Sequence, residues 1–177
     1  MNTAETLSKQ QDVLKVDMFD LRRAAGRYVT GVSVITATSG EGAPVGATVN
    51  AITCLSLNPP LYLACLGNAS NTLKAVKEGG HFGINVLSRD QGEHAKVFAS
   101  KSSDKFANVP YETGCTGAPL LKECVARFEC EVESLYAGGD HTILVGRVVD
   151  LWECDEAPLV MRSGQIVDLA AASGVSL

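Results

Sequence analysis

Residues 126–135 alternate between apolar and polar side chains more regularly than any other part of the chain. The apolar positions are Ala126, Phe128, Cys130 and Val132, and the charged positions are Arg127, Glu129, Glu131 and Glu133. Because successive side chains of a strand point to opposite faces, this period of two predicts a β-strand with one face on a core and the other in water. Such strands are typical of antiparallel sheets, since parallel strands are buried on both faces.

Other runs rich in β-branched residues, bounded by glycine, proline or asparagine, predict further short strands. They cover 32–38, 45–50, 61–66, 81–87, 142–152, 159–161 and 166–169, and the first two form a hairpin. About seven strands without regular strand–helix alternation predict a mainly β fold, an antiparallel barrel with a few peripheral helices. The glycines of G-E-G-A-P-V-G at 40–46 are not a dinucleotide fingerprint, because a strand follows them where a helix must begin.

Helical periodicity is confined to three segments. Asp17 can cap a first helix, whose apolar face would consist of Met18, Leu21, Ala24, Ala25 and Tyr28. Residues 70–79, closed by two glycines, and 91–106, broken near Ser102, are expected to form the others. Residues 1–16 and 171–177 are predicted to be tails, which leaves a single domain at 17–170.

The formal net charge of −5 argues against nucleic acid or anionic membrane as the main partner. The longest uninterrupted apolar run, Leu61–Leu66, is far shorter than a membrane span, and the polar first residues lack the apolar core of a signal peptide. We therefore expect a cytoplasmic protein that acts on small molecules.

The chain has 6 cysteines but no C-x-x-C pair. Most of them lie inside apolar or alternating runs, which predicts buried reduced thiols and no metal site. They are Cys54, Cys65, Cys115, Cys124, Cys130 and Cys154.

Several segments taken together resemble a known family. The chain carries F-D-L-R-R-A-A-G-R-Y-V-T-G-V-S-V-I-T at 19–36, G-A-T-V-N-A-I-T-C-L-S-L-N-P-P at 46–60, F-G-I-N-V-L at 82–87, T-G-A-P-L-L at 116–121, F-E-C-E-V at 128–132 and G-D-H-T-I-L-V-G at 139–146. In this order they resemble the short-chain flavin reductase family, which includes the reductase components of two-component aromatic monooxygenases. The resemblance runs from about Phe19 to Leu169.

This resemblance implies a Greek-key split barrel that forms a homodimer, with a flavin in a cleft near the subunit interface. The implied activity is hydride transfer from NADH or NADPH, with NADH favoured, to FMN or FAD, through stacked rings and without a side-chain nucleophile. The reduced flavin would then be passed to a separate oxygenase component that acts on an aromatic substrate.

The resemblance also implies the site residues. The flavin contacts would be Thr48, Val49, Asn50, Ala51, Ser56, Leu57, Ser70, Asn71 and Thr72, with Lys105 at the phosphate and His141 near the nicotinamide. The residue types fit these roles, because strand ends offer donors to a ring edge and a helix N-terminus favours an anion. Lys105 stands where many relatives have arginine.

Each of these residues also has an ordinary structural interpretation. Thr48 and Asn50 can simply end a strand, Ser70 can cap a helix, Lys105 can be a surface lysine, and His141 can be a hydrogen-bonded turn residue. Two alternatives to a reductase therefore remain open. One is a non-catalytic flavin carrier or sensor on the same barrel, and the other is a β-barrel binding module that takes no flavin.

Overall fold

The computed structural model describes residues 16–167. The predicted tail at 171–177 and all but the last residue of the one at 1–16 lie outside the described residues, as does the end of the strand predicted at 166–169. Among the described residues, no helix has the length and apolar character needed to cross a membrane.

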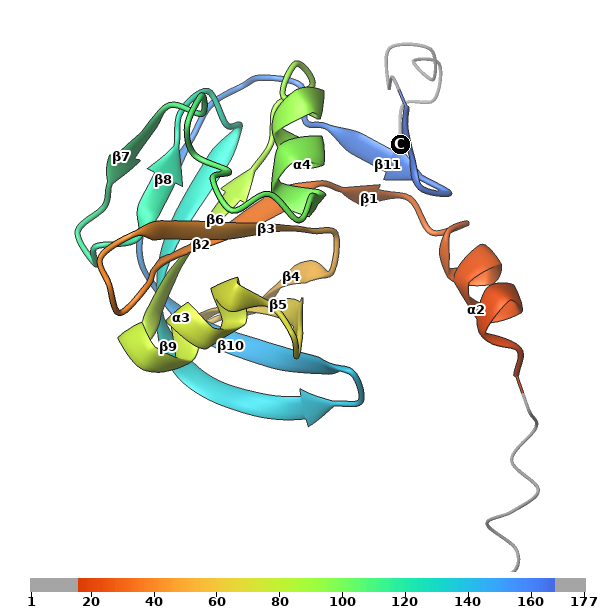
Figure 1. The fold of residues 1–177 in the computed structure, drawn as a ribbon, viewed down its shortest axis with the longest axis horizontal. Helices are drawn as coiled ribbons and strands as arrows, with labels where there is room; N and C mark the ends of the chain where they lie inside the picture. Colours follow the sequence, from red (N-terminus) through yellow and green to blue (C-terminus); the bar gives the residue numbers. More distant parts are fainter. Residues whose placement is uncertain (1–15, 168–177) are drawn as a thin grey trace, which may run out of the picture.

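A seven-stranded antiparallel sheet makes up most of the fold and curves around the core (Figure 1). In spatial order its strands are β3 (Pro44–Val49), β2 (Ser33–Thr38), β6 (His81–Val86), β9 (Ala126–Gly138), β10 (His141–Glu153), β5 (Pro60–Gly67) and β4 (Ile52–Leu57). The predicted hairpin is confirmed as β2 and β3. The mainly β, antiparallel prediction is therefore confirmed.

Two small sheets complete the architecture. One contains β1 (Thr30–Gly31), β11 (Val160–Arg162) and β12 (Gln165–Val167), and it lies to one side of the large sheet (Figure 1). The other pairs β7 (Tyr111–Thr113) with β8 (Pro119–Leu121), which the sequence pattern did not predict. These strands are only three residues long, so a period of two cannot be recognised in them.

The helices begin where the capping residues predict. Asp17 accepts hydrogen bonds from the backbone N–H groups of Phe19 and Asp20 and so caps α2 (Met18–Ala25). Ser70 caps α3 (Asn71–Gly79), which ends at Gly80 in the left-handed conformation that glycine adopts without strain.

The third predicted helix is shorter than expected. α4 runs only from Gly92 to Ala99, because Ser100 adopts an extended conformation and its side chain bonds back to the Val97 carbonyl. Residues 100–106 are therefore not helical, although their side chains are compatible with a helix.

Two apolar clusters form the core. The first fills the curve of the large sheet with side chains such as Ile35, Phe82 and Leu144, and α3 covers it with Leu73 and Val76. The second lies under α4 and the segment that follows it, and it includes Phe98, Phe106, Leu121 and Leu159. Together they bury enough apolar surface for one domain without disulfides, and all the cysteines are free thiols.

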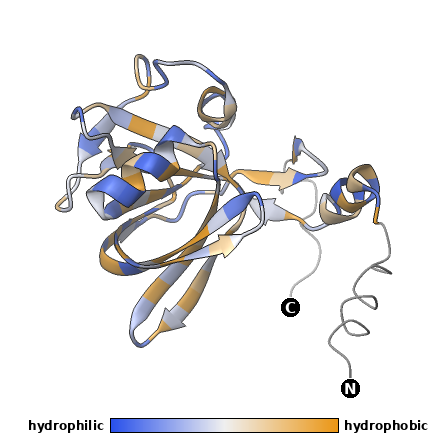
Figure 2. Ribbon diagram, turned by 60° about the horizontal axis from the view of Figure 1, so that its bottom comes forward, coloured by the Kyte–Doolittle hydropathy of each residue, from blue (hydrophilic) through white to orange (hydrophobic). Residues whose placement is uncertain are grey.

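Helix α2 is set apart from this core. No residue of α2 is buried, and Figure 2 shows the helix standing beside the sheet rather than on it. The side chains of Met18 and Leu21 are 71% and 59% exposed. The predicted apolar face of α2 therefore exists, but in a single chain it packs against nothing.

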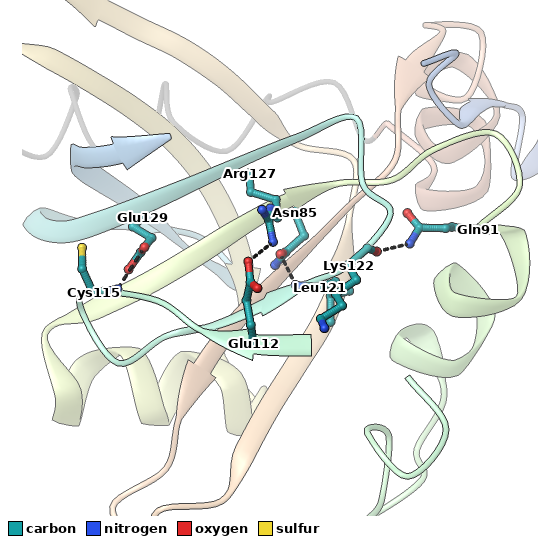
Figure 3. Close-up of polar contacts among 8 residues, drawn as sticks. All are labelled: Asn85, Gln91, Glu112, Cys115, Leu121, Lys122, Arg127 and Glu129. Carbon is teal, nitrogen blue, oxygen red and sulfur yellow. Dashed lines mark hydrogen bonds and ion pairs between the residues drawn. The ribbon is translucent and has the colours of Figure 1, made fainter. Parts of the chain in front are cut away.

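The alternating strand is confirmed as the first part of β9, and its apolar side chains face the first core cluster. The expectation of a wet opposite face is wrong at Glu129, which is 3% exposed. The loop before β8 covers it, and its carboxylate accepts a hydrogen bond from Cys115 N (Figure 3). It also accepts hydrogen bonds from Thr116 N and the Thr116 hydroxyl.

Asn85 and Gln91 hold the same covering segment in a similar way (Figure 3). Asn85 accepts a hydrogen bond from Leu121 N at 2.7 Å, and Gln91 donates one to the Lys122 carbonyl at 2.7 Å. Buried side-chain amides thus take the place of a sheet ladder where residues 107–125 cross the strands.

Glu129→Gln is expected to lower the free energy of unfolding by about 1–3 kcal/mol at neutral pH, because the amide can accept at only one of the two oxygen positions. Burial by itself would raise the pKa of Glu129, but the hydrogen bonds from Thr116 and Cys115 more than offset it, so the pKa is lowered. The native carboxylate therefore stabilises the fold above its unfolded pKa of about 4.3, and this contribution is lost as the pH falls through the lower native pKa.

Urea unfolding of wild type and Glu129→Gln at several pH values checks this. The difference between the two proteins should be largest above about pH 5 and should shrink below about pH 4. Glu131→Gln, on the same strand but exposed, is the matched control and should change stability little. A Glu129 variant as stable as wild type at neutral pH would contradict this role.

Candidate functional site

The ends of β3, β5 and β10 meet at one end of the large sheet. β10 begins at His141, which pairs with Gly67 at the end of β5. Residues 50–51 follow β3, and the Ala51 carbonyl accepts a hydrogen bond from Cys65 N at 3.0 Å. Segments that are almost a hundred residues apart in sequence, from Thr48 to His141, are thereby brought together.

Three adjoining cavities lie along this end. The first, of about 320 Å³, lies at the start of α3 and is lined by Ser70, Asn71, Thr72, Lys101 and Lys105 among others. The second, of about 170 Å³, shares Ser70 with the first and is lined by 47–51, 65–67 and His141. The third, of about 1510 Å³, shares Asn50, Ala51 and His141 with the second and opens toward α2. The three cavities are therefore neighbours, each sharing part of its lining with the next.

The first cavity has the character of an anion site. The opening turn of α3 presents backbone N–H groups at the positive end of the helix dipole. The Ser70 hydroxyl oxygen accepts from Thr72 N at 3.2 Å, so the capping interpretation of Ser70 is confirmed. Capping and anion binding are compatible, because a single side-chain cap satisfies only one of the free N–H groups of the first turn.

Lys105 approaches the same cavity from the segment after α4. Its ammonium donates to the Gly46 and Phe98 carbonyls at 3.2 and 2.8 Å, which leaves a third N–H for a ligand in the cavity. Burial lowers the pKa of Lys105. An interpretation as a solvated surface lysine does not fit this position, because the side chain is held at the cavity wall.

The second cavity is lined by Thr48, Val49, Asn50 and Ala51. Thr48 donates its hydroxyl proton to the Ala95 carbonyl of α4 at 2.7 Å, so its oxygen is left as an acceptor. The groups that remain for a planar ligand are the backbone of 48–51 and the exposed Asn50 side chain. The surrounding residues are small or neutral, which suits a flat uncharged heterocycle.

His141 lies where the second and third cavities join. Its Nδ1 is 2.7 Å from an oxygen of Asp140, which fixes the ring and lowers the pKa of that carboxyl. The ring leans over Gly67, where a Cβ would lie 3.9 Å from His141 Nε2. The imidazole therefore stands at the cavity junction with its second nitrogen directed across the strand ends.

Ser56 and Leu57 are not brought into this group. Both lie on β4, which extends through residues expected to be a connection, and Leu57 is 86% exposed. Ser56 pairs with Leu61, six residues along β5 from the end that faces His141, which is roughly 20 Å away at the rise of a strand. A single chain therefore keeps these two residues outside the three cavities.

Other lining residues were missed by the sequence analysis. The far wall of the third cavity is made by α2 with Phe19, Arg22 and Arg23, and by the β11–β12 turn with Ser163 and Gly164. The turn is joined to α2 by a hydrogen bond from Ser163 N to the Gly26 carbonyl, 2.7 Å long. A run of arginines on one helix in an acidic chain was the available signal.

A curved antiparallel sheet whose strand ends and one helix N-terminus line an elongated site defines a class of ligand-binding β proteins. The chain belongs to the family described as "Flavin reductase like domain", which matches residues 25–170. The resemblance inferred from the motifs is confirmed.

Named relatives extend this finding. A probable flavin reductase of Rhizobium meliloti (strain 1021) is 40% identical over 76% of this chain and 44% of its own length. The flavin-dependent monooxygenase reductase subunit HsaB of Rhodococcus jostii (strain RHA1) is 37% identical over 85% of this chain and 77% of its own length. The chain thus spans less than half of the first relative.

A solved structure shares the fold. The NADH:FAD oxidoreductase SgcE6 of Streptomyces globisporus C-1027, in complex with NAD and FAD fragments, superposes with a TM-score of 0.84 at 34% identity. The match covers 89% of this chain and 96% of that one.

Proposed function

We propose that this protein is an oxidoreductase that transfers a hydride from NADH or NADPH, with NADH favoured, to FMN or FAD. The observation that carries the proposal is the order of the three neighbouring cavities, from a helix N-terminus suited to an anion, past neutral strand ends, to a wide cavity beside His141. A flavin mononucleotide has the same order of parts, with a phosphate, a ribityl chain and a planar ring. The comparisons support the assignment, because relatives are named flavin reductases.

The chain's own residues would bind and orient the two reactants. Ser70, Asn71, Thr72 and Lys105 hold the phosphate, while the backbone of 48–51 fixes the ring edge. When bound, the flavin supplies N5 as the hydride acceptor. The third cavity leaves one ring face open for nicotinamide, and His141 at its edge positions the donor. Such positioning accounts for catalysis without a nucleophile or a metal.

The test is an oxidation assay that crosses FMN and FAD with NADH and NADPH. Nicotinamide oxidation above the blank with at least one pair is expected, with NADH as the better donor. Absence of turnover with all four pairs would contradict the proposal. If flavin nevertheless bound tightly, the carrier or sensor alternative would be favoured, and if neither flavin bound, the flavin-free binding module would be.

The reduced flavin would serve a separate oxygenase component. HsaB is named as a reductase subunit of a flavin-dependent monooxygenase, which supports this part of the proposal. We infer an aromatic substrate for that oxygenase from the family resemblance. A cytoplasmic location belongs to the same proposal and would keep the cysteines reduced.

A homodimer with a Greek-key split barrel in each subunit is also part of the proposal. The apolar stripe of α2, with Met18 and Leu21, is more exposed than a stable soluble chain normally leaves neighbouring large side chains. A second copy is the occupant that the family resemblance implies. It would also cover the exposed side of the third cavity.

Leu21→Glu is expected to shift the protein from dimer toward monomer, because the stripe would then bring a charge into an apolar contact. Sedimentation velocity at several concentrations measures this. Asp20→Glu, on the same helix with charge retained, should leave the dimer intact. A wild type that stays monomeric at high concentration, or a Leu21→Glu variant as dimeric as wild type, would contradict the assignment of this stripe.

A further inference from the structure

Helix α2 turns one face toward the third cavity, and Ala25 of the apolar stripe lies at the edge of that face. Phe19, Arg22, Arg23 and Gly26 follow the i, i+3, i+4, i+7 spacing of one helical face, and all four line the third cavity. Met18 and Leu21 belong to the other face and do not line it. Figure 1 shows α2 held away from the large sheet, beyond β1. The cavity is lined by residues of α2 on one side and by residues 50–53 and His141 on the other.

The wall formed by α2 is strongly basic. Arg22, Arg23 and Arg27 all line the cavity, while none of its lining residues is an aspartate or glutamate. This contrasts with a chain that has 20 acidic and 15 basic residues. Arg23 forms a solvent-exposed ion pair with Asp20 at 2.7 Å, but among the described residues no ion pair joins Arg22 or Arg27.

The opposite wall has no charge to match these arginines. It is formed by Asn50, Ala51, Thr53 and His141, which are the residues at the end of the site assigned to the rings. Arg22 and Arg27, which have no ion-pair partner among residues 16–167, line a cavity without carboxylates, and this arrangement suits an anionic ligand. The planar guanidinium donates two parallel hydrogen bonds to phosphate oxygens, so a phosphate ester is the anion that this wall fits best.

We infer that the arginine face, made up of Arg22 and Arg23 on α2 and Arg27 just after the helix, binds the pyrophosphate of the reduced pyridine dinucleotide, with the nicotinamide at His141 across the cavity. The inference rests on the proposed function and names the residues that recognise the electron donor. The volume of about 1510 Å³ exceeds the usual 300–1,000 Å³ of a small-ligand pocket, which leaves room for a dinucleotide beside a flavin ring.

An ordinary structural role for these arginines makes a different prediction. Arg22 and Arg23 lie in the last turn of α2, where cations stabilise the helix through its dipole. If this were their whole role, their loss would affect every donor equally or none at all. The adenosine diphosphate part of FAD also carries a pyrophosphate that fits these arginines. FMN lacks that group, so it is the acceptor in the main experiment.

The experiment compares two electron donors on the full-length protein. NADH carries the pyrophosphate, whereas dihydronicotinamide riboside carries the same reducing ring without any phosphate. For the double variant Arg22→Gln/Arg27→Gln, kcat/KM for NADH should fall roughly ten- to hundredfold, the range for losing one or two charge-assisted hydrogen bonds. Most of the loss should lie in KM for NADH, while kcat/KM for the riboside and KM for FMN should stay within about twofold.

Two further variants make the result decisive. Arg22→Lys/Arg27→Lys keeps the charge and should recover part of the NADH affinity, but not the bidentate geometry. Arg89→Gln removes an exposed arginine outside the cavity and should change neither donor. The increase of KM for NADH with salt should also be weaker in the glutamine double variant.

The possible outcomes separate the inference from the proposed function. An equal fall with NADH and the riboside, or unchanged kinetics with NADH, would overturn the role of the arginine face. A change in KM only when FAD replaces FMN as acceptor would assign the arginines to the flavin adenylate instead and also overturn it. A wild type that oxidises neither donor would refute the reductase function itself.

Discussion

Replacing Lys105 with methionine is expected to weaken FMN binding roughly ten- to hundredfold, because a charge-assisted hydrogen bond to phosphate contributes about 1.5–3 kcal/mol. The ammonium is already oriented by the Gly46 and Phe98 carbonyls, so little side-chain entropy is lost when it meets a phosphate. Quenching of flavin fluorescence in a titration measures the affinity.

Three controls separate phosphate binding from structural damage. Riboflavin, which has no phosphate, should bind the wild type and Lys105→Met with similar affinity. Lys105→Arg should bind FMN at least as well as the wild type, because a guanidinium can donate two parallel hydrogen bonds to a phosphate. Lys101 lines the same cavity but, unlike Lys105, has no hydrogen bond to the α4 or β3 backbone. Lys101→Met should therefore have the smaller effect. A Lys105→Met variant that loses riboflavin and FMN equally would contradict the phosphate role.

His141→Ala is expected to reduce kcat/KM for NADH by roughly ten- to a hundredfold, while the Kd of FMN changes by no more than about threefold. The imidazole lies at the mouth of the third cavity, where the donor would lie, and a small displacement of the reacting ring costs this much in rate. Stopped-flow measurement of flavin reduction, together with the FMN titration, separates the two quantities.

The Asp140 carboxylate provides a second readout for the same variant. The hydrogen bond and charge of His141 lower the pKa of Asp140, so His141→Ala should let that pKa rise toward its ordinary value. NMR titration of the carboxyl carbon would detect the shift. His81→Ala, at the start of β6 and away from the cavities, is the matched control. An equal loss of FMN binding and of NADH turnover in His141→Ala would contradict its assignment to the donor.

Local patterns were enough to predict the elements that have strong local causes. The period of two in β9 and the caps at Asp17 and Ser70 depend on neighbouring residues only, and the structure confirms each of them. β4 was missed because N-P-P at 58–60 marks a loop and the strand lies at the sheet edge with most side chains exposed. Edge strands lack the alternation that burial on one face imposes.

The site could be predicted only as separate pieces. Ser70 and Lys105 fit an anion by residue type, but their sharing of a cavity depends on how the segment after α4 folds back. Glu129 is buried by the loop around Thr116, which has no strand or helix periodicity of its own. The sequence pattern therefore placed this glutamate on the solvent-exposed face of the strand. The position of α2 is set by the contact between Ser163 and Gly26, which no spacing in the sequence predicts.

A crystal structure of the protein with FMN bound tests the central claim most directly, because that claim places the flavin in the first two cavities and leaves the third to the electron donor. We expect the phosphate against the start of α3 and Lys105, the ring edge on the backbone of 48–51, and one ring face open toward His141 and α2. An FMN found elsewhere on the chain, or a ring whose two faces are both covered by protein, would contradict the account.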